Sequence, residues 1–99
     1  MYMIGIDNTI AQQPFHDLQV EQLVKNPSME ILSVSLAKGA LFPKHSSPKD
    51  VHLFVLEGCI DFYIENQIIN LTSQQHFSFS KNVEHWVLAN EDAKLLIIR

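Results

Sequence analysis

The stretch HSSPKDVHLFVLEG, residues 45–58, begins with a histidine, carries a second histidine at position 52 and ends on a glycine. Its second half, residues 51–58, is apolar at both alternating sets of positions. That pattern is typical of a central strand buried on both faces in a packed barrel or sandwich. Gly58 directly follows Glu57 and precedes another apolar stretch. We therefore predict a tight hairpin turn at these two residues, joining the strand to the next one.

Short strands separated by turns flank this stretch on both sides. Residues 29–37 alternate in polarity, with Leu32, Val34 and Leu36 on the predicted core face, and residues 59–66 alternate in the same way. Further short strands are predicted over residues 67–71, 76–80, 85–89 and 94–98. A series of roughly six to nine short strands predicts an all-β protein, either a sandwich or a barrel.

The length of the chain sets the predicted domain organisation. Its 99 residues are enough for one compact domain and too few for two. Residues 1–28 mix apolar and polar side chains, and the pattern over 17–26 fits a helix or a strand equally well. We therefore predict an N-terminal arm over 1–28 and a barrel over 29–98, within a single domain over 1–99.

Composition excludes several classes of partner. Hydrophobic residues make up 46% of the chain and charged residues 18%, which is typical of a folded core. The seven Lys and Arg residues are scattered and the net charge is −4, so we expect no nucleic-acid partner. No stretch approaches the roughly 20 apolar residues of a membrane span, and residues 1–10 lack the regions of a signal peptide. With one cysteine, Cys59, and hence no internal disulfide, we expect a cytoplasmic protein without a membrane partner.

Five histidines in so short a chain suggest a metal site. His16 lies in the predicted arm without a nearby partner, and we expect it at the surface. His76 lies on the polar side of a strand whose other side carries two phenylalanines, and we expect it to face solvent. His45 and His85 each lie where a loop meets a strand, and ligand-binding side chains are commonly displayed at such junctions.

Two segments resemble the conserved motifs of the cupin superfamily. GALFPKHSSPKDVHLFVLEG, residues 39–58, resembles the first motif, in which five residues lie between a glycine and a histidine and a second glycine closes the motif. SQQHFSFSKNVEHWVLAN, residues 73–90, resembles a degenerate second motif ending on a histidine. The resemblance implies a cupin-like β-barrel (a double-stranded β-helix or jelly roll), often dimeric. In the family a divalent metal commonly lies in the barrel mouth, bound by three histidines and one glutamate.

The family's metal-ligand pattern is incomplete in this chain. The resemblance assigns His45 to the first ligand position and His85 to the last, while Ser47 and Val51 occupy the positions of the second histidine and the glutamate. His52 lies one residue from the glutamate position and would reach the site only through a β-bulge, since one residue reverses the face of a strand. Two imidazoles fall below the three protein ligands typical of catalytic zinc.

Two functions are therefore predicted as alternatives. In the first, the barrel binds a small organic ligand in a pocket that includes His45, Ser47, Val51 and His85, with a reduced or absent metal site. In the second, the chain is a metal-dependent enzyme of the dioxygenase or isomerase type with His45 and His85 as metal ligands, completed by His52, His76 or the substrate. The expected cofactor is accordingly none, or a weakly bound divalent Zn, Ni, Fe or Mn.

The apolar patterning also suggests a second copy of the chain as a partner. Strand 51–57 carries apolar residues on both faces, and a short barrel leaves open strand edges. We therefore expect a homodimer in which the N-terminal arm or an outer sheet face covers the partner.

Overall fold

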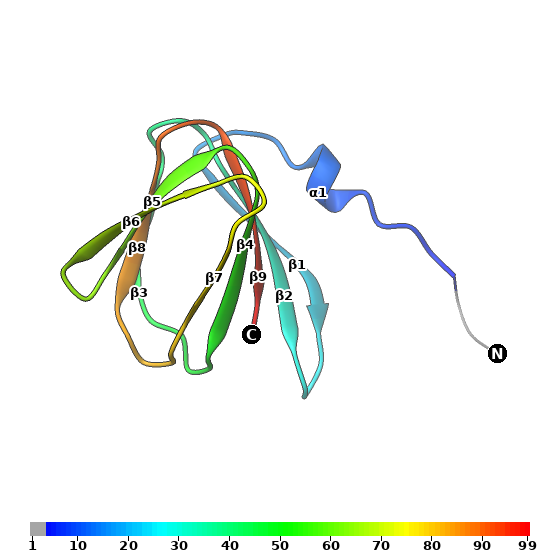
Figure 1. Ribbon diagram of the computed structural model, residues 1–99. Helices are drawn as coiled ribbons and strands as arrows, with labels where there is room; N and C mark the ends of the chain where they lie inside the picture. The colour runs from blue at the N-terminus through cyan, green and yellow to red at the C-terminus, as the bar shows by residue number, and fades with distance from the viewer. Residues whose placement is uncertain (1–3) are drawn as a thin grey trace.

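The computed structural model describes residues 4–99, which form nine strands and one short helix (Figure 1). Their bounds are α1 Thr9–Gln12, β1 Leu18–Lys25, β2 Glu30–Leu36, β3 Leu41–His45, β4 Val51–Glu57, β5 Cys59–Ile64, β6 Gln67–Thr72, β7 His76–Phe79, β8 His85–Ala89 and β9 Ala93–Ile98. Within this described part of the chain, no helix has the length and apolar character needed to cross a membrane.

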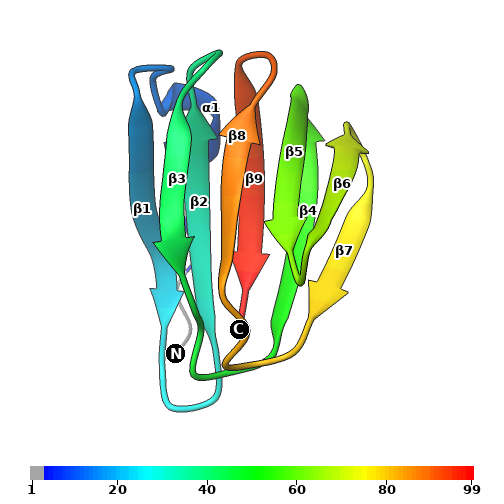
Figure 2. The same cartoon turned by 90° about the vertical axis from the view of Figure 1, so that its left-hand side faces the viewer.

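The strands form two antiparallel sheets that face each other (Figure 2). The five-stranded sheet has the order β1-β2-β9-β4-β7, and the four-stranded sheet has the order β3-β8-β5-β6. The inner faces of both sheets supply the core, in which Val34, Leu36, Ile60, Phe62 and Leu95 are almost completely buried. The predicted all-β barrel is therefore confirmed.

Strand β4 has the central position that its sequence predicts. It pairs with β9 on one side and with β7 on the other. Val51, Leu53 and Val55 point into the core, while His52 is exposed on the outer face and Leu56 is 39% exposed there. The strand is thus apolar on both faces, but only its inner face is fully buried.

The predicted hairpin at Glu57 and Gly58 is wrong, because β4 and β5 lie in different sheets. Gly58 instead forms the corner at which the chain passes from one sheet to the other. It has a φ of +89°, and a Cβ there would collide with the carbonyl oxygen of Asp92 and lie 2.7 Å from the Cα of Ala93. Glycine is required here both for its left-handed backbone and for this close approach.

The N-terminal arm is shorter than the sequence predicts. Residues 18–25 form β1, which pairs with β2 from Leu18 opposite Leu36 to Lys25 opposite Glu30, with a register shift after Gln22. The boundary therefore moves from residue 29 to residue 18, because the ambiguous pattern over 17–26 is resolved by pairing with a long neighbouring strand. Residues 1–3 of the predicted arm lie outside the described residues.

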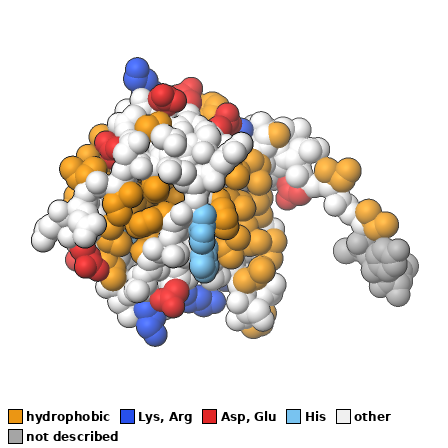
Figure 3. Space-filling model, viewed as in Figure 1, with side chains coloured by type: hydrophobic (Ala, Val, Ile, Leu, Met, Phe, Trp, Pro, Cys, Tyr) orange, Lys and Arg blue, Asp and Glu red, His pale blue; other side chains and the backbone are white. Residues whose placement is uncertain are grey.

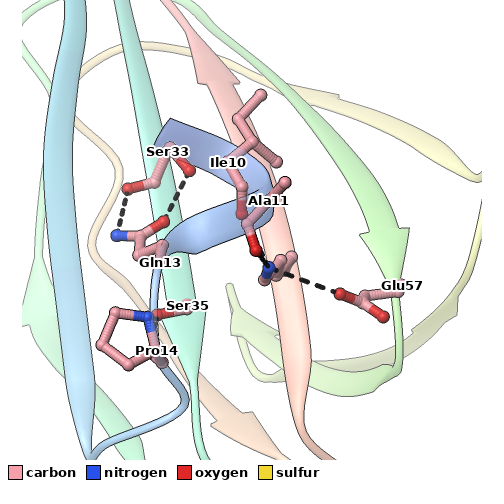
Figure 4. A network of polar contacts seen from close by, with 8 residues as sticks. Ile10, Ala11, Gln13, Pro14, Ser33, Ser35 and Glu57 are labelled. Carbon is pink, nitrogen blue, oxygen red and sulfur yellow. Dashed lines mark hydrogen bonds and ion pairs between the residues drawn. The ribbon is translucent and has the colours of Figure 1, made fainter. Parts of the chain in front are cut away.

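The remaining arm covers the outer face of β2. Ser33 and Ser35, which the alternation places away from the core, are nevertheless fully buried. The Gln13 side chain donates to the Ser33 carbonyl at 3.1 Å and accepts from the Ser33 hydroxyl at 2.6 Å, and the Ser35 hydroxyl donates to the Pro14 carbonyl at 2.7 Å (Figure 4). The arm therefore satisfies polar groups whose burial without partners would be costly.

Lys94 fixes the helix of the arm to the same face. Lys94 is a buried residue, only 6% exposed. Its ammonium group donates to the carbonyls of Ile10 at 2.6 Å and Ala11 at 3.3 Å, and it lies 3.7 Å from a carboxylate oxygen of Glu57 (Figure 4). On the N-terminal side of α1 the chain projects away from the barrel (Figure 3). In this segment Ile4 is 86% exposed and Ile6 is 89% exposed. The two isoleucines are separated by Gly5, and neither belongs to the core cluster or packs against it.

Replacement of Gly58 by valine should destabilise the fold more than the same replacement at Gly39. Both glycines have a positive φ, but a Cβ at Gly39 would meet nothing within 4 Å. We expect Gly39→Val to show backbone strain alone, and Gly58→Val to lose on the order of 1–3 kcal/mol plus the cost of the collision with Asp92. Urea unfolding measures both losses. Equal losses at the two positions would show that the close approach at the corner has no energetic effect.

The projecting arm leads to a prediction about assembly. Because the side chains of Ile4 and Ile6 are exposed in the single chain, we expect a second copy to cover them in a homodimer. Light scattering at micromolar concentration should give twice the 11.3 kDa mass of the chain. Ile4→Asp with Ile6→Asp should shift the protein toward the monomer, while Asn66→Asp with Ser73→Asp, at two exposed turn residues of the barrel, adds the same two negative charges and serves as the control. A monomer mass for the unmodified chain would contradict the prediction.

Candidate functional site

A cavity of about 230 Å³ lies between the two sheets. Ten of its fourteen lining residues are apolar: Val20, Leu32, Phe42, Val51, Leu53, Phe62, Phe79, Val87, Leu95 and Ile97. The lining comes from both sheets, so the cavity is the unfilled part of the barrel interior. Its apolar walls are typical of sites for small organic molecules.

The four polar lining residues lie at one end of the barrel. They are His45, Ser47, His85 and Arg99. His45 ends β3, His85 begins β8 and Arg99 directly follows β9. Figure 2 shows that β3, β7 and β9 finish at the same end of the barrel at which β4 and β8 begin. The antiparallel topology therefore gathers polar side chains from distant parts of the sequence around one mouth.

The rings of His45 and His85 are directly apposed. Cross-strand pairing of β3 with β8 places the two residues opposite each other, and their Nε2 atoms are 3.0 Å apart. Phe42 stacks on the His45 ring at 4.4 Å between ring centroids, and Phe79 contacts the His85 ring edge-on at 4.5 Å. Aromatic packing therefore restricts the orientation of both imidazoles.

Hydrogen bonds to the backbone determine which nitrogen of each ring carries its proton. The Nδ1 of His45 lies 2.6 Å from the Pro43 carbonyl, and the Nδ1 of His85 lies 2.9 Å from the Val83 carbonyl. Because a carbonyl only accepts, each Nδ1 must carry a hydrogen and donate it. Each Nε2 of a neutral ring is then an acceptor, and two lone pairs meet at 3.0 Å. A shared proton, or an electropositive group bound beside them, would satisfy both.

The surroundings of His85 disfavour its charged form. Burial lowers the pKa of His85 below its ordinary value, and the nearby His45 and Arg99 lower this pKa further. The hydrogen bond to Val83 opposes these effects without reversing them. At neutral pH the ring therefore presents an unprotonated Nε2 to the cavity.

Ser47 and Val51 lie where the resemblance assigns the missing ligands. Both side chains line the cavity beside the histidine pair, and both residues are 3% exposed. The Ser47 hydroxyl accepts from the Lys49 amide at 3.2 Å, and the Val51 side chain is an apolar part of the wall. All four predicted pocket residues thus surround one cavity, while their role in binding stays a prediction.

The remaining histidines lie outside the barrel. Val51 faces the cavity and β4 has no bulge between residues 51 and 55, so His52 points to the outer face. There its Nδ1 lies 2.8 Å from the Nε2 of His76, which is also exposed. His16 is exposed in the arm, as predicted. His52 and His76 therefore do not complete the barrel site.

Arg99 is a lining residue that the sequence pattern did not identify. It follows the apolar strand β9, whose inward residues Leu95 and Ile97 have the same parity. The period of two could have placed Arg99 on the inner face. Its Nε donates to Glu30 at 2.7 Å, and this hydrogen bond lowers the pKa of the Glu30 carboxyl.

The donor set of the mouth does not fit a resident metal held by the protein alone. Within residues 4–99, no three His, Cys, Asp or Glu side chains are grouped so as to hold a metal ion. The two imidazoles are one ligand short of a typical catalytic zinc site, and a serine hydroxyl is a poor ligand for metals that prefer imidazole. The arrangement is better suited to polar recognition of an organic molecule.

Comparison with known proteins identifies the fold. No protein-family model and no curated protein matches the sequence. An RmlC-like cupin protein from Desulfovibrio desulfuricans superimposes with a TM-score of 0.85 at 21% sequence identity, covering 97% of this chain and 95% of that chain. A conserved protein of unknown function from Streptococcus pyogenes gives a TM-score of 0.80 at 23% identity, covering 99% and 87%.

A third solved structure gives the architecture by name. It is an RmlC-like cupin family protein with a double-stranded β-helix fold from Methanocaldococcus jannaschii, with a TM-score of 0.81 at 22% identity over 89% of this chain and 83% of that chain. At such identities the likeness concerns the arrangement of the strands. Together with the two facing antiparallel sheets, it shows that the chain has the double-stranded β-helix fold of these solved cupin structures.

Proposed function

We propose that the barrel binds a small organic anion, a carboxylate with an apolar body. The observation that carries this proposal is the distribution of charge around the cavity. Arg99 at its mouth is cationic, and a proton shared between the Nε2 atoms of His45 and His85 would add a second positive charge, whereas the cavity lining among the described residues includes no Asp or Glu. An anionic group at this end of the ligand would meet basic partners, and the rest of the molecule would contact apolar walls.

The approach to the mouth is also basic. A neighbouring hollow shares Arg99 with the cavity and is lined in addition by Lys25, Lys49 and Glu30. Three cations against one carboxylate give this end a local positive excess on a chain whose net charge is −4. Such a field attracts anions and raises their local concentration.

The volume of the cavity limits the size of the ligand. At about 230 Å³ it is smaller than the roughly 300–1,000 Å³ of sites for drug-sized molecules. Phe42, Phe62 and Phe79 contribute rigid aromatic surfaces to its wall. A short aliphatic or single-ring carboxylate therefore suits the site better than a nucleotide or a long lipid.

The alternative, a metal-dependent enzyme, has one observation in its favour. Both cavity histidines donate from Nδ1 to a backbone carbonyl, as metal-binding histidines commonly do. It nevertheless requires donors beyond the two imidazoles, and Ser47 and Val51 do not provide them. Anion binding requires only that the two imidazoles share a proton, in addition to the charge of Arg99.

Carboxylates should stabilise the protein more than their neutral analogues. Hexanoate and benzoate serve as probes, with hexanamide and benzamide as matched neutral molecules. A ligand present at one hundred times its Kd stabilises a protein by about 2.7 kcal/mol, which for a domain of this size raises Tm by roughly 10–20 °C. We expect thermal unfolding to show such a shift with at least one acid and a much smaller shift with its amide. Equal shifts with acid and amide would contradict the anionic part of the proposal.

Removal of the charge of Arg99 should weaken this effect selectively. We expect Arg99→Gln to reduce carboxylate affinity, measured by calorimetry, because one cation of the mouth is lost. Lys38→Gln is the matched control, since it removes one positive charge from an exposed residue that does not line the cavity. Equal losses in the two variants would indicate a general effect of net charge.

Restoring the missing ligand positions should create a metal site in the barrel. We expect Ser47→His with Val51→Glu to bind Ni²⁺ or Zn²⁺ at least tenfold more tightly than the native barrel, about 1.4 kcal/mol or more, because three imidazoles and a carboxylate then surround one point. His52→Gln and His76→Gln are included in every protein of this titration, so that only the barrel can bind. Adding His85→Gln should reverse most of the gain. No gain in the double substitution would show that the four positions do not converge.

A further inference from the structure

A second histidine pair lies on the outer face of the five-stranded sheet. His52 in β4 and His76 in the edge strand β7 are both exposed, and His52 Nδ1 lies 2.8 Å from His76 Nε2. Figure 3 shows exposed histidine side chains between two groups of hydrophobic side chains on this face of the molecule. The pair is separated from the barrel cavity by the wall of the sheet, since Val51, Leu53 and Phe79, the residues that line the cavity from these strands, point the other way.

The spacing of the two nitrogens suits a metal ion. With metal–nitrogen bonds of about 2.05 Å, two ligands at a right angle are about 2.9 Å apart, and two ligands at a tetrahedral angle are about 3.3 Å apart. The observed 2.8 Å is a hydrogen-bond distance close to the right-angle value, and with ring centroids 5.0 Å apart the two nitrogens point almost directly at each other, so the exposed rings have to rotate for both to bind one ion. Right-angle coordination is typical of Cu²⁺ and Ni²⁺, both of which bind imidazole well.

Within the described residues, the ring nitrogens of His52 and His76 form no hydrogen bond to the protein backbone. Within residues 4–99, the one polar partner of each ring is the other ring, in contrast to the barrel pair with its two carbonyl acceptors. The ring of His76 stacks on Phe54 at 4.6 Å between centroids, and the ring of His52 lies edge to edge with that of His76. A metal ion could therefore replace the shared hydrogen without breaking another hydrogen bond.

Oxygen groups lie next to the pair. A hollow at the end of β4 and β7 is lined by Asp50, His52, Ser78 and Ser80 together with Val51 and Phe79. The outer pair supplies two protein ligands, as the barrel pair does, but it is exposed, so water in this polar hollow can complete the coordination of an ion. Asp50 already accepts from the Lys81 amide at 2.9 Å, which orients its carboxylate on this side of the sheet.

We infer that His52 and His76 form a surface site for a divalent transition metal of the Ni²⁺ or Cu²⁺ class, which links β7 to β4. Strand β7 has four residues and pairs only with β4 among the described strands, from Val51 opposite Phe79 to Phe54 opposite His76. A metal bond across the two strands adds a link to this short edge. The inference is independent of the proposed anion binding in the barrel.

The link also reaches the barrel wall. Phe77 and Phe79 project inward from β7 and pack against Phe62, each at 5.0 Å between ring centroids. Phe79 also contacts the ring of His85. An ion on the outer face would therefore restrain the strand that forms one side of the cavity.

Calorimetric titration of the tag-free chain with Ni²⁺ tests the site. We expect one ion per chain with saturation at submillimolar concentration, and a loss of tenfold or more in affinity for each of His52→Gln and His76→Gln. His16→Gln, which removes an exposed histidine outside both pairs, should keep the native affinity. Absence of binding by the native chain overturns the inference. Loss of binding on His85→Gln, with His52→Gln and His76→Gln at native affinity, also overturns it, because the ion then lies in the barrel.

Two further measurements separate an ion on this face from incidental binding. Ser78 lies directly opposite His52 and on the same face as His76, so Ser78→His adds a third imidazole and should tighten Ni²⁺ binding tenfold or more. Hydrogen exchange of the β7 amides should slow on addition of Ni²⁺ in the native chain and stay unchanged in His52→Gln. Unchanged affinity in Ser78→His overturns the assignment to this face, and unchanged exchange in the native chain overturns the link between the strands.

Discussion

The alternation of side chains along β4 is the constraint on which the rest of the structure depends. Val51, Leu53 and Val55 close one wall of the core, and the residues between them form the outer face. A shift of one residue would place His52 in the cavity and Val51 in solvent, which the burial of the apolar side chains opposes. The separation of the histidines into an inner and an outer pair follows from this register.

The two pairs differ in how their polar atoms are satisfied. In the barrel, the carbonyls of Pro43 and Val83 accept from the two Nδ1 atoms, so the two Nε2 atoms must meet as acceptors in an apolar space. On the outer face, His52 and His76 satisfy each other and remain exposed to water. Buried acceptors without donors are costly, whereas exposed ones are hydrated. The barrel pair therefore has a stronger demand for an electropositive partner, and the outer pair is freer to exchange one.

The outer face of the five-stranded sheet is divided between the arm and solvent. Over β2 and β9, Gln13 and Lys94 bind backbone carbonyls across the interface with the arm, and serines that alternation would expose are buried. Over β4 and β7 the face is uncovered, with Leu56 partly exposed beside the histidine pair. The polar bonds of the arm thus convert half of an outer sheet face into a second, smaller buried layer.

By itself the sequence determined the all-β class, most strand positions and the inward faces of β2, β5 and β7, because these depend on a local period of two. The resemblance of two of its segments to the cupin motifs also identified His45, Ser47, Val51 and His85, which line one cavity. It did not determine the partner of a strand: β1 became part of the sheet through pairing with β2, and Gly58 became a corner between sheets because β5 pairs with β6 and β8. Only the tertiary structure brought Arg99 to the mouth, His52 to His76 and Gln13 to Ser33. These contacts join residues far apart in the sequence, and they depend on which strands lie side by side, a choice that local alternation leaves open.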